Sequence, residues 1–129
     1  MKVTNLDHYN LRAPREVLET LREFYCEIIG LSVGDRPPFA EFGYWLYAGD
    51  QAVLHLSEGG EDKMQSSAAA TSFSHAAFAC TGRAAFEQRL SAHGIDYEVA
   101  RVPDAGPIQL FLHDPAGNGI ELSFARGED

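Results

Sequence analysis

Three histidines and one glutamate stand at matching positions in two halves of the chain. The segment LDHYNL aligns with FSHAAF, which places His8 opposite His75 at an offset of 67 residues. The segment AGDQAVLHLS aligns with PAGNGIELS, which places His55 opposite Glu121 at an offset of 66. Imidazole and carboxylate groups bind divalent metals, and a carboxylate among apolar residues is costly unless it is paired or coordinated. The pattern therefore predicts a metal site.

Each of these four side chains lies in a segment with the alternating pattern of a β-strand. Successive side chains of a strand point to opposite faces of its sheet. Glu121 alternates with apolar residues in GIELSF, and His55 lies between two leucines. If the apolar faces cover the helices, His8, His55, His75 and Glu121 all point to the other side of a curved sheet.

The elements around these strands follow the same order in both halves. VTNLDHYNLRA predicts a strand, and the next segment predicts a helix between Pro14 and Gly30, because its apolar residues recur every three or four positions. YWLYAG and QAVLHLS predict a hairpin through Gly49. The second half repeats the order with FSHAAFAC, a helix over about Gly82–His93, and the strands YEVARV, IQLFLHD and GIELSF.

The repeat defines the expected domain organisation. We predict a single domain over residues 1–129, built from two modules. Module one spans about residues 3–57, and module two spans about residues 73–126. The polar, aperiodic segment between them, residues 58–72, is expected to be a connector.

Composition restricts the classes of protein to consider. A chain of 129 residues with 45% hydrophobic residues can bury a core. Its net charge of −9 and its scattered cationic residues disfavour nucleic acid. No apolar run approaches the roughly 20 residues of a membrane span, and the first residues lack the apolar core of a signal peptide. We therefore expect a cytoplasmic protein with neither a nucleic-acid nor a membrane partner.

The paired modules, the helix end FYCEIIGL and the closing segment HDPAGNGIELSF resemble the vicinal oxygen chelate superfamily. This group includes glyoxalase I, methylmalonyl-CoA epimerase, extradiol dioxygenases and bleomycin-resistance proteins. The resemblance covers about Val3 to Phe124. It implies an α+β fold in which two βαβββ modules, related by pseudo-twofold symmetry, form a curved mixed sheet around a metal cleft.

The resemblance also implies a ligand set and a chemistry. Family ligands fall on the first and last strand of each module, which assigns His8, His55, His75 and Glu121 to one divalent ion: Zn, Ni, Co, Mn or Fe. Glyoxalase I-like members have glutamate at the position of His55, and epimerases have glutamine. By similarity, Glu121 is both a ligand and the catalytic proton carrier, acting on carbon next to a carbonyl.

Three functions remain open at this point. The resemblance favours a metal-dependent glyoxalase-like lyase or isomerase that binds a small substrate through adjacent oxygens. An Fe²⁺ ring-cleaving dioxygenase would use His8, His75 and Glu121 as its facial triad. A third class, the non-catalytic proteins that sequester a drug, generally lacks these ligands.

Other residues are expected around the substrate. Arg12 shares the predicted face of His8 and is placed to meet an anionic group, while Tyr47 and His113 are candidates for the pocket wall. Family members are usually homodimers, so the resemblance implies a homodimer here, with the metal site either within one chain or across the dimer. The sequence identifies neither the metal nor the small-molecule substrate.

Overall fold

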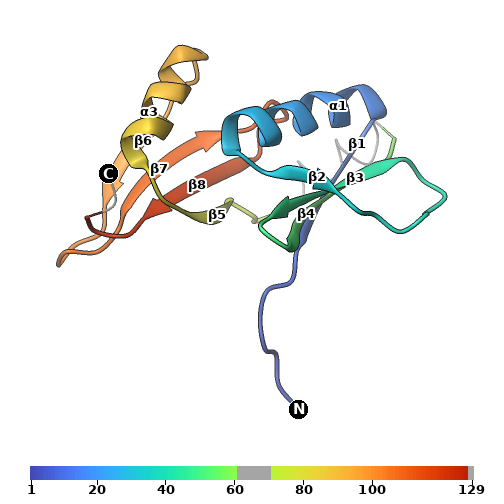
Figure 1. Cartoon of the computed structure of the whole chain (residues 1–129), viewed down its shortest axis with the longest axis horizontal. Helices are drawn as coiled ribbons and strands as arrows, with labels where there is room; N and C mark the ends of the chain where they lie inside the picture. Colours follow the sequence, from blue (N-terminus) through green and yellow to red (C-terminus); the bar gives the residue numbers. More distant parts are fainter. Residues whose placement is uncertain (61–70, 128–129) are drawn as a thin grey trace. The chain divides into compact units, whose positions relative to one another are not determined.

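The computed structural model describes residues 1–60 and 71–127, so most of the predicted connector, residues 58–72, lies outside the described residues. The chain divides into two compact units, Met1–Thr71 and Ser72–Asp129 (Figure 1). Unit 1 and unit 2 each contain one four-stranded mixed sheet.

Unit 1 contains a helical segment between its first and second strands. Its elements in chain order are β1 (Tyr9–Ala13), α1 (Arg15–Phe24), the π-helix η1 (Tyr25–Ile29), β2 (Ser32–Gly34), β3 (Gly43–Ala48) and β4 (Gln51–Glu58). The strand order in the sheet is β1-β4-β3-β2. β1 runs parallel to β4, and the other pairs are antiparallel.

Unit 2 repeats this plan. Its elements are β5 (His75–Cys80), α3 (Arg83–Ala92), β6 (Glu98–Arg101), β7 (Ile108–His113) and β8 (Gly119–Phe124). The strand order is β5-β8-β7-β6, with β5 parallel to β8 and the other pairs antiparallel. The predicted α+β class with two βαβββ modules is therefore confirmed.

The strand register reproduces the alignment predicted from the sequence. In unit 1, His55 on β4 pairs with Asn10 on β1 and with Trp45 on β3. In unit 2, Glu121 on β8 holds the equivalent position between Ala77 on β5 and Phe111 on β7. His55 and Glu121 thus occupy the same place in their respective sheets.

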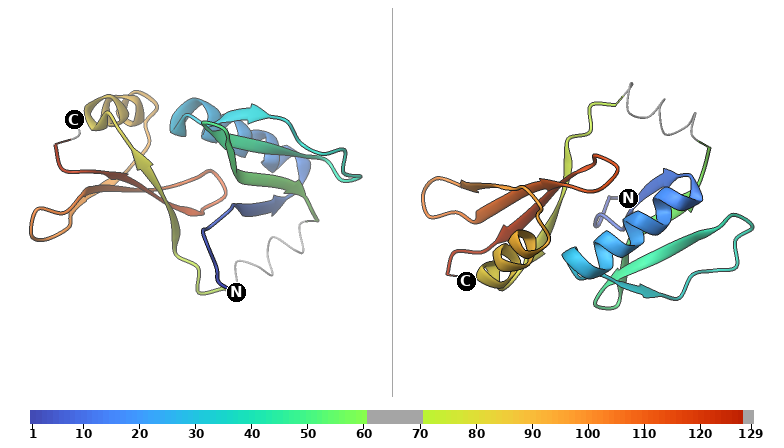
Figure 2. Two further views of the ribbon diagram at one scale, coloured as in Figure 1. Left: turned by 60° about the horizontal axis from the view of Figure 1, so that its bottom comes forward. Right: turned by 90° about the horizontal axis from the view of Figure 1, so that it is seen from above.

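The helix of unit 1 follows the predicted apolar period but changes its winding. α1 packs across the strands of its sheet (Figure 2) through the buried side chains Leu18, Leu21 and Phe24. At Tyr25 the chain continues as a π-helix, where the sequence had predicted one uninterrupted helix. Gly30 ends it at φ 99°, a left-handed conformation that favours glycine.

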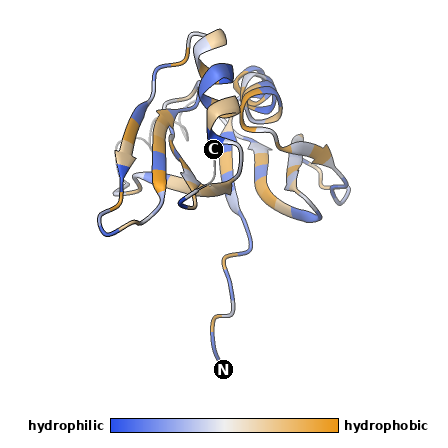
Figure 3. Cartoon of the chain, turned by 60° about the vertical axis from the view of Figure 1, so that its left-hand side comes forward, coloured by the Kyte–Doolittle hydropathy of each residue, from blue (hydrophilic) through white to orange (hydrophobic). Residues whose placement is uncertain are grey.

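The core of each unit comes from one face of its sheet. Figure 3 shows bands of hydrophilic and hydrophobic residues alternating along the strands, as expected for side chains that point to opposite faces. Leu54 and Leu56 in unit 1 and Leu110 and Leu122 in unit 2 are fully buried. Among the described residues, no helix combines the length and apolar composition that crossing a membrane requires.

One strand boundary and one additional strand differ from the sequence prediction. β1 begins at Tyr9 rather than near Val3, so His8 lies just before the strand. β2 was not predicted, because three residues are too few to show a strand period; its pairing with β3 forms it. The predicted hairpin is confirmed, with Gly49 at φ 63° in the turn between β3 and β4.

Candidate metal and substrate site

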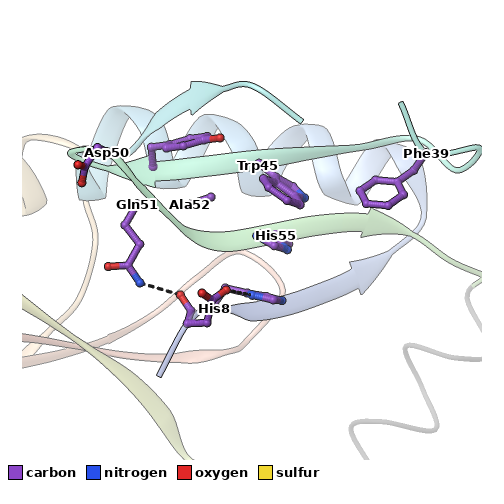
Figure 4. A pocket seen from close by; sticks show the side chains of 9 residues that line it. His8, Phe39, Trp45, Asp50, Gln51, Ala52 and His55 are labelled. Atoms are coloured by element: carbon purple, nitrogen blue, oxygen red, sulfur yellow. Dashed lines mark hydrogen bonds and ion pairs between the residues drawn. The ribbon is translucent and has the colours of Figure 1, made fainter. Parts of the chain in front are cut away.

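Three aromatic rings form a continuous stack on the sheet of unit 1. The His8 and His55 ring centroids lie 3.7 Å apart, with an angle of 15° between the planes. The Trp45 ring lies against His55 at 4.0 Å and 9°. Register explains the second contact, because Trp45 and His55 are paired across β3 and β4. Figure 4 shows the stack from close by.

The stack borders a cavity of about 560 Å³ within unit 1. Its aromatic lining consists of Phe39, Trp45 and Tyr47 together with the imidazole rings of His8 and His55. Its polar lining includes Asp7, Asp50 and Gln51. A mostly apolar hollow with a few polar groups is typical of small-molecule sites.

The surroundings of His55 disfavour its protonated form. Burial lowers the pKa of His55 below its ordinary value of 6.5, and the nearby His8 lowers it further. His55 Nε2 is buried and has no hydrogen-bond partner among the described residues. His8 differs, since its Nδ1 lies 2.7 Å from the Asp7 carboxylate. At neutral pH His55 therefore presents a neutral imidazole with an unused nitrogen.

Unit 2 carries an imidazole and a carboxylate at the equivalent positions. His75 Nε2 lies 3.1 Å from Glu121 Oε1. Glu121 is only 7% exposed, and Gln109 Nε2 donates a hydrogen bond of 3.1 Å to its other carboxylate oxygen, Oε2. The Phe111 and His75 rings meet in a T-shaped contact, with their centroids 5.4 Å apart. The buried carboxylate is thus held from two sides.

Gly119 lets His75 approach β8. A Cβ atom added at Gly119 would lie 2.3 Å from the Ser74 carbonyl oxygen and 3.1 Å from His75 Cβ. Any side chain at this position would therefore push β5 away. The glycine keeps β5 and β8 close enough for His75 and Glu121 to meet.

The three residues predicted for the pocket wall have different surroundings. Tyr47 lines the large cavity, and its hydroxyl donates a hydrogen bond of 2.6 Å to the Asp35 carbonyl. Arg12 lines a second, smaller cavity of unit 1. His113 is exposed at the end of β7, opposite Gly119, on the strand face that also carries Phe111.

The structure brings the predicted ligands together in pairs. His8 meets His55 within unit 1, and His75 meets Glu121 within unit 2. Neither unit gathers three or more potential ligand side chains among its described residues. The convergence of all four on one ion stays a prediction.

Sequence reasoning missed the residues that hold these pairs in place. Gln109 and Phe111 lie in the predicted strand IQLFLHD, and their register opposite β8 is the signal that identifies them. Trp45 belongs to the predicted strand YWLYAG, and in the structure it lines the cavity. Arg36, in the loop before β3, gave no signal in the sequence.

Comparison with known proteins independently supports the family resemblance seen in the sequence. A family model described as the Glyoxalase/Bleomycin resistance protein/Dioxygenase superfamily matches residues 5–122. The chain is 31% identical over 126 residues to Glyoxylase I 4 of Arabidopsis thaliana, covering 95% of this chain and 71% of the relative.

Solved structures share the fold. A glyoxalase family protein from Bacillus anthracis superposes with a TM-score of 0.72 and 25% identity, covering 97% of this chain and 98% of that one. Lactoylglutathione lyase from Agrobacterium tumefaciens gives a TM-score of 0.67 at 20% identity, covering 98% and 97% of the two chains. At that identity the second likeness concerns the fold alone.

Proposed function

Because the chain belongs to the Glyoxalase/Bleomycin resistance protein/Dioxygenase superfamily, we propose that it is a metal-dependent, glyoxalase-like lyase or isomerase. Its substrate is a small molecule with two adjacent oxygens, from which a proton is removed next to a carbonyl. One observation carries the proposal: equivalent positions of the two sheets hold donor pairs, His8 with His55 and His75 with Glu121.

The donor atoms of unit 2 fit a divalent ion. Superfamily members generally bind a divalent metal. Two ligand atoms at right angles on an ion, each about 2.1 Å from it, lie about 3 Å apart. The separation of 3.1 Å between His75 Nε2 and Glu121 Oε1 matches this value.

The donor atoms of unit 1 fit less directly. His55 offers a buried nitrogen without a hydrogen-bond partner among the described residues, as a metal-binding imidazole requires. The stacked rings of His8 and His55 lie in nearly parallel planes with their centroids 3.7 Å apart, so a single ion cannot lie in the plane of both rings. His8 would therefore bind the same ion as His55 only after its ring turns. Three imidazoles and one carboxylate suit Zn, Ni, Co, Mn or Fe.

The chain's own residues supply binding and proton transfer. A bound divalent ion would act as a Lewis acid toward the substrate oxygens. Glu121 accepts the proton, while Gln109 holds one carboxylate oxygen and leaves the other facing His75. In unit 1, Trp45 and Tyr47 line the cavity against which the carbon skeleton of a substrate packs.

Metal content and turnover test this proposal together. Protein purified without chelator should contain about one divalent ion per chain and turn over a hemithioacetal or an acyl-CoA epimer. Glu121→Gln should lose metal and lower kcat by about 10²- to 10⁴-fold, because the amide cannot carry the proton. Glu98→Gln, at an exposed glutamate of β6, is the matched control.

Two other results would replace the proposal. Bound iron with oxygen-dependent cleavage of a catechol would identify a ring-cleaving dioxygenase. Absence of metal, with tight binding of an unaltered compound, would identify a sequestering protein. Undiminished metal and activity in Glu121→Gln would refute the role of Glu121.

A further inference from the structure

A second cavity of unit 1, of about 140 Å³, shares Phe39, Trp45 and His55 with the large one. The polar part of its lining consists of Asn10, Arg12, Arg36, Glu41 and Ser57. Two guanidinium groups against one carboxylate make this lining positive, in a chain whose net charge is −9. The space has room for several water molecules, and hence for a carboxylate or phosphate group.

Arg36 lacks a close partner in this cavity. Its Nε is buried and has no hydrogen-bond acceptor among the described residues. Glu41 Oε1 lies 4.0 Å from Arg36 Nη2, which is beyond hydrogen-bond distance. The Arg36 side chain is 16% exposed, whereas that of Glu41 is 48% exposed. A buried donor without an acceptor is destabilising, and the part of the Arg36 side chain that remains exposed is where an incoming oxyanion would meet the guanidinium.

Neighbouring residues hold the Arg36 guanidinium in place. It lies over the Phe39 ring, 4.9 Å from the centroid. A Cβ atom added at Gly43 would lie 2.8 Å from Arg36 Nη2, so the guanidinium occupies space that only glycine leaves open. The Tyr47 hydroxyl anchors the loop at the preceding residue, Asp35. The group is therefore positioned before any ligand arrives.

Further donors lie around the same cavity. Asn10 Nδ2 donates to Ser57 Oγ at 2.9 Å, which fixes the Asn10 amide on the cavity wall. Arg12 Nη1 donates to the Glu58 carbonyl at 3.3 Å. The planar fork of a guanidinium matches two oxygens of a carboxylate or phosphate. The lining thus has the composition of an oxyanion site.

We propose that Arg36 binds an oxyanion, the carboxylate or phosphate end of a small molecule, with Arg12 and Asn10 beside it. The identification of this molecule as the substrate rests on the proposed function. The binding of an anion in this cavity is independent of that function. The cavity adjoins His55, so a substrate held at its anionic end by Arg36 would extend past that imidazole into the larger cavity.

Trp45 provides the measurement, because it is the only tryptophan of the chain and lines both cavities. Metal-free protein, dialysed to remove the chelator, is titrated with acetate and separately with inorganic phosphate at constant ionic strength. Trp45 fluorescence should change saturably with at least one of them. Arg36→Gln should weaken binding by about ten- to hundredfold. Arg15→Gln, at an exposed arginine outside the cavity, should leave it unchanged.

Glu41→Gln provides a test in the opposite direction. Removing the carboxylate that competes for Arg36 should strengthen anion binding by up to about fivefold, as expected for an exposed ion pair. This variant keeps Arg36 and tests the proposal even if Arg36→Gln does not fold.

The outcomes separate the anion site from the proposed reaction. Binding lost in Arg36→Gln and strengthened in Glu41→Gln supports the site, and the tighter of the two probes identifies the anion. No saturable change, or equal affinity in wild type and Arg36→Gln, overturns it. Because no metal is present, neither result depends on the catalytic proposal.

Discussion

In unit 1 the donor pair consists of two imidazole rings, and in unit 2 it consists of one imidazole and one carboxylate. His55 and Glu121 hold equivalent register positions in the two sheets, while His75 begins β5 and His8 lies just before β1. The rings of unit 1 lie in an aromatic stack where burial lowers the pKa of His55. The carboxylate of unit 2 is held by polar neighbours, His75 and Gln109. The fold thus fixes the positions, while the residue type at each position decides which donor group it offers.

The helices of the two units also differ. α1 buries Leu18, Leu21 and Phe24. Over its own length, α3 buries only Leu90. Both helices contain ten residues, and each follows the first strand of its unit. The attachment of α3 to its unit therefore depends on fewer apolar contacts, which makes the two helices a sensitive test of the comparison.

The largest effect should come from truncating one core side chain on each helix. Leu18→Ala and Leu90→Ala each remove a fully buried leucine and should lower the free energy of unfolding by about 2–5 kcal/mol. Leu90→Ala should also remove most of the protection of the α3 amides against hydrogen exchange. Leu18→Ala should leave α1 largely protected, because Leu21 and Phe24 still pack.

Exposed positions on the same helices provide the controls for that experiment. Glu23→Ala on α1 and Gln88→Ala on α3 should change the free energy of unfolding by less than about 0.5 kcal/mol. Equal retention of protection in the two helices after the leucine truncations would contradict the difference drawn between them.

These differences indicate how far the sequence alone determines the molecule. The module order, the amphipathic period of α1 and the turn at Gly49 were predicted, because each depends on local chemistry. β2 was missed because its three residues form a strand only through pairing with β3. An α-helix that ends in a π-helical segment has the same apolar pattern as an uninterrupted α-helix, so the sequence did not predict η1 either.

For the candidate site too, the sequence predicted the positions of the donor residues but not the contacts around them. Alternation and the internal repeat identified His8, His55, His75 and Glu121 as equivalent positions. They gave no indication that Gln109 contacts Glu121, because that contact depends on register between strands. Arg36 lies in a loop without periodicity, and its place beside His55 depends on how that loop folds over β3.

Acid should lower the free energy of unfolding of unit 1 through His55. The effect should be smaller than that of core truncation because it comes from a single side chain. A folded pKa below 6.5 means that the unfolded state binds more protons between the two values. The contribution of His55 to stability is therefore complete above about pH 6.5 and decreases as the pH falls toward the folded pKa. Urea unfolding of metal-free protein from pH 8 to 5 would measure this dependence.

Two variants isolate this contribution. His55→Gln should flatten the decline between pH 6.5 and 5, because glutamine does not titrate. Gln88→Ala, at an exposed residue of α3 that does not titrate, should keep the slope of the wild type. If the pH dependence of the free energy of unfolding is unchanged in His55→Gln, the acid sensitivity arises from other groups. The difference drawn between the buried imidazole of unit 1 and the carboxylate of unit 2 would then lose its support.

The smallest effects should come from the ion pairs near the helices. Arg15 Nε lies 2.9 Å from Glu58 Oε2 in unit 1, and Arg83 Nη1 lies 2.7 Å from Glu87 Oε2 in unit 2. Partly exposed pairs contribute about 0–1 kcal/mol. Glu58→Gln and Glu87→Gln should both fall in this range and shrink further in 1 M salt.

Glu87→Gln should cost more than Glu58→Gln, for a reason specific to unit 2. Glu87 also accepts a hydrogen bond of 3.0 Å from the Tyr97 hydroxyl, which links α3 to the segment before β6. A double-mutant cycle of Glu87→Gln with Tyr97→Phe should therefore show coupling that salt does not remove. Zero coupling would mean that this contact does not help to hold α3, leaving its attachment to Leu90 and the side chains around it.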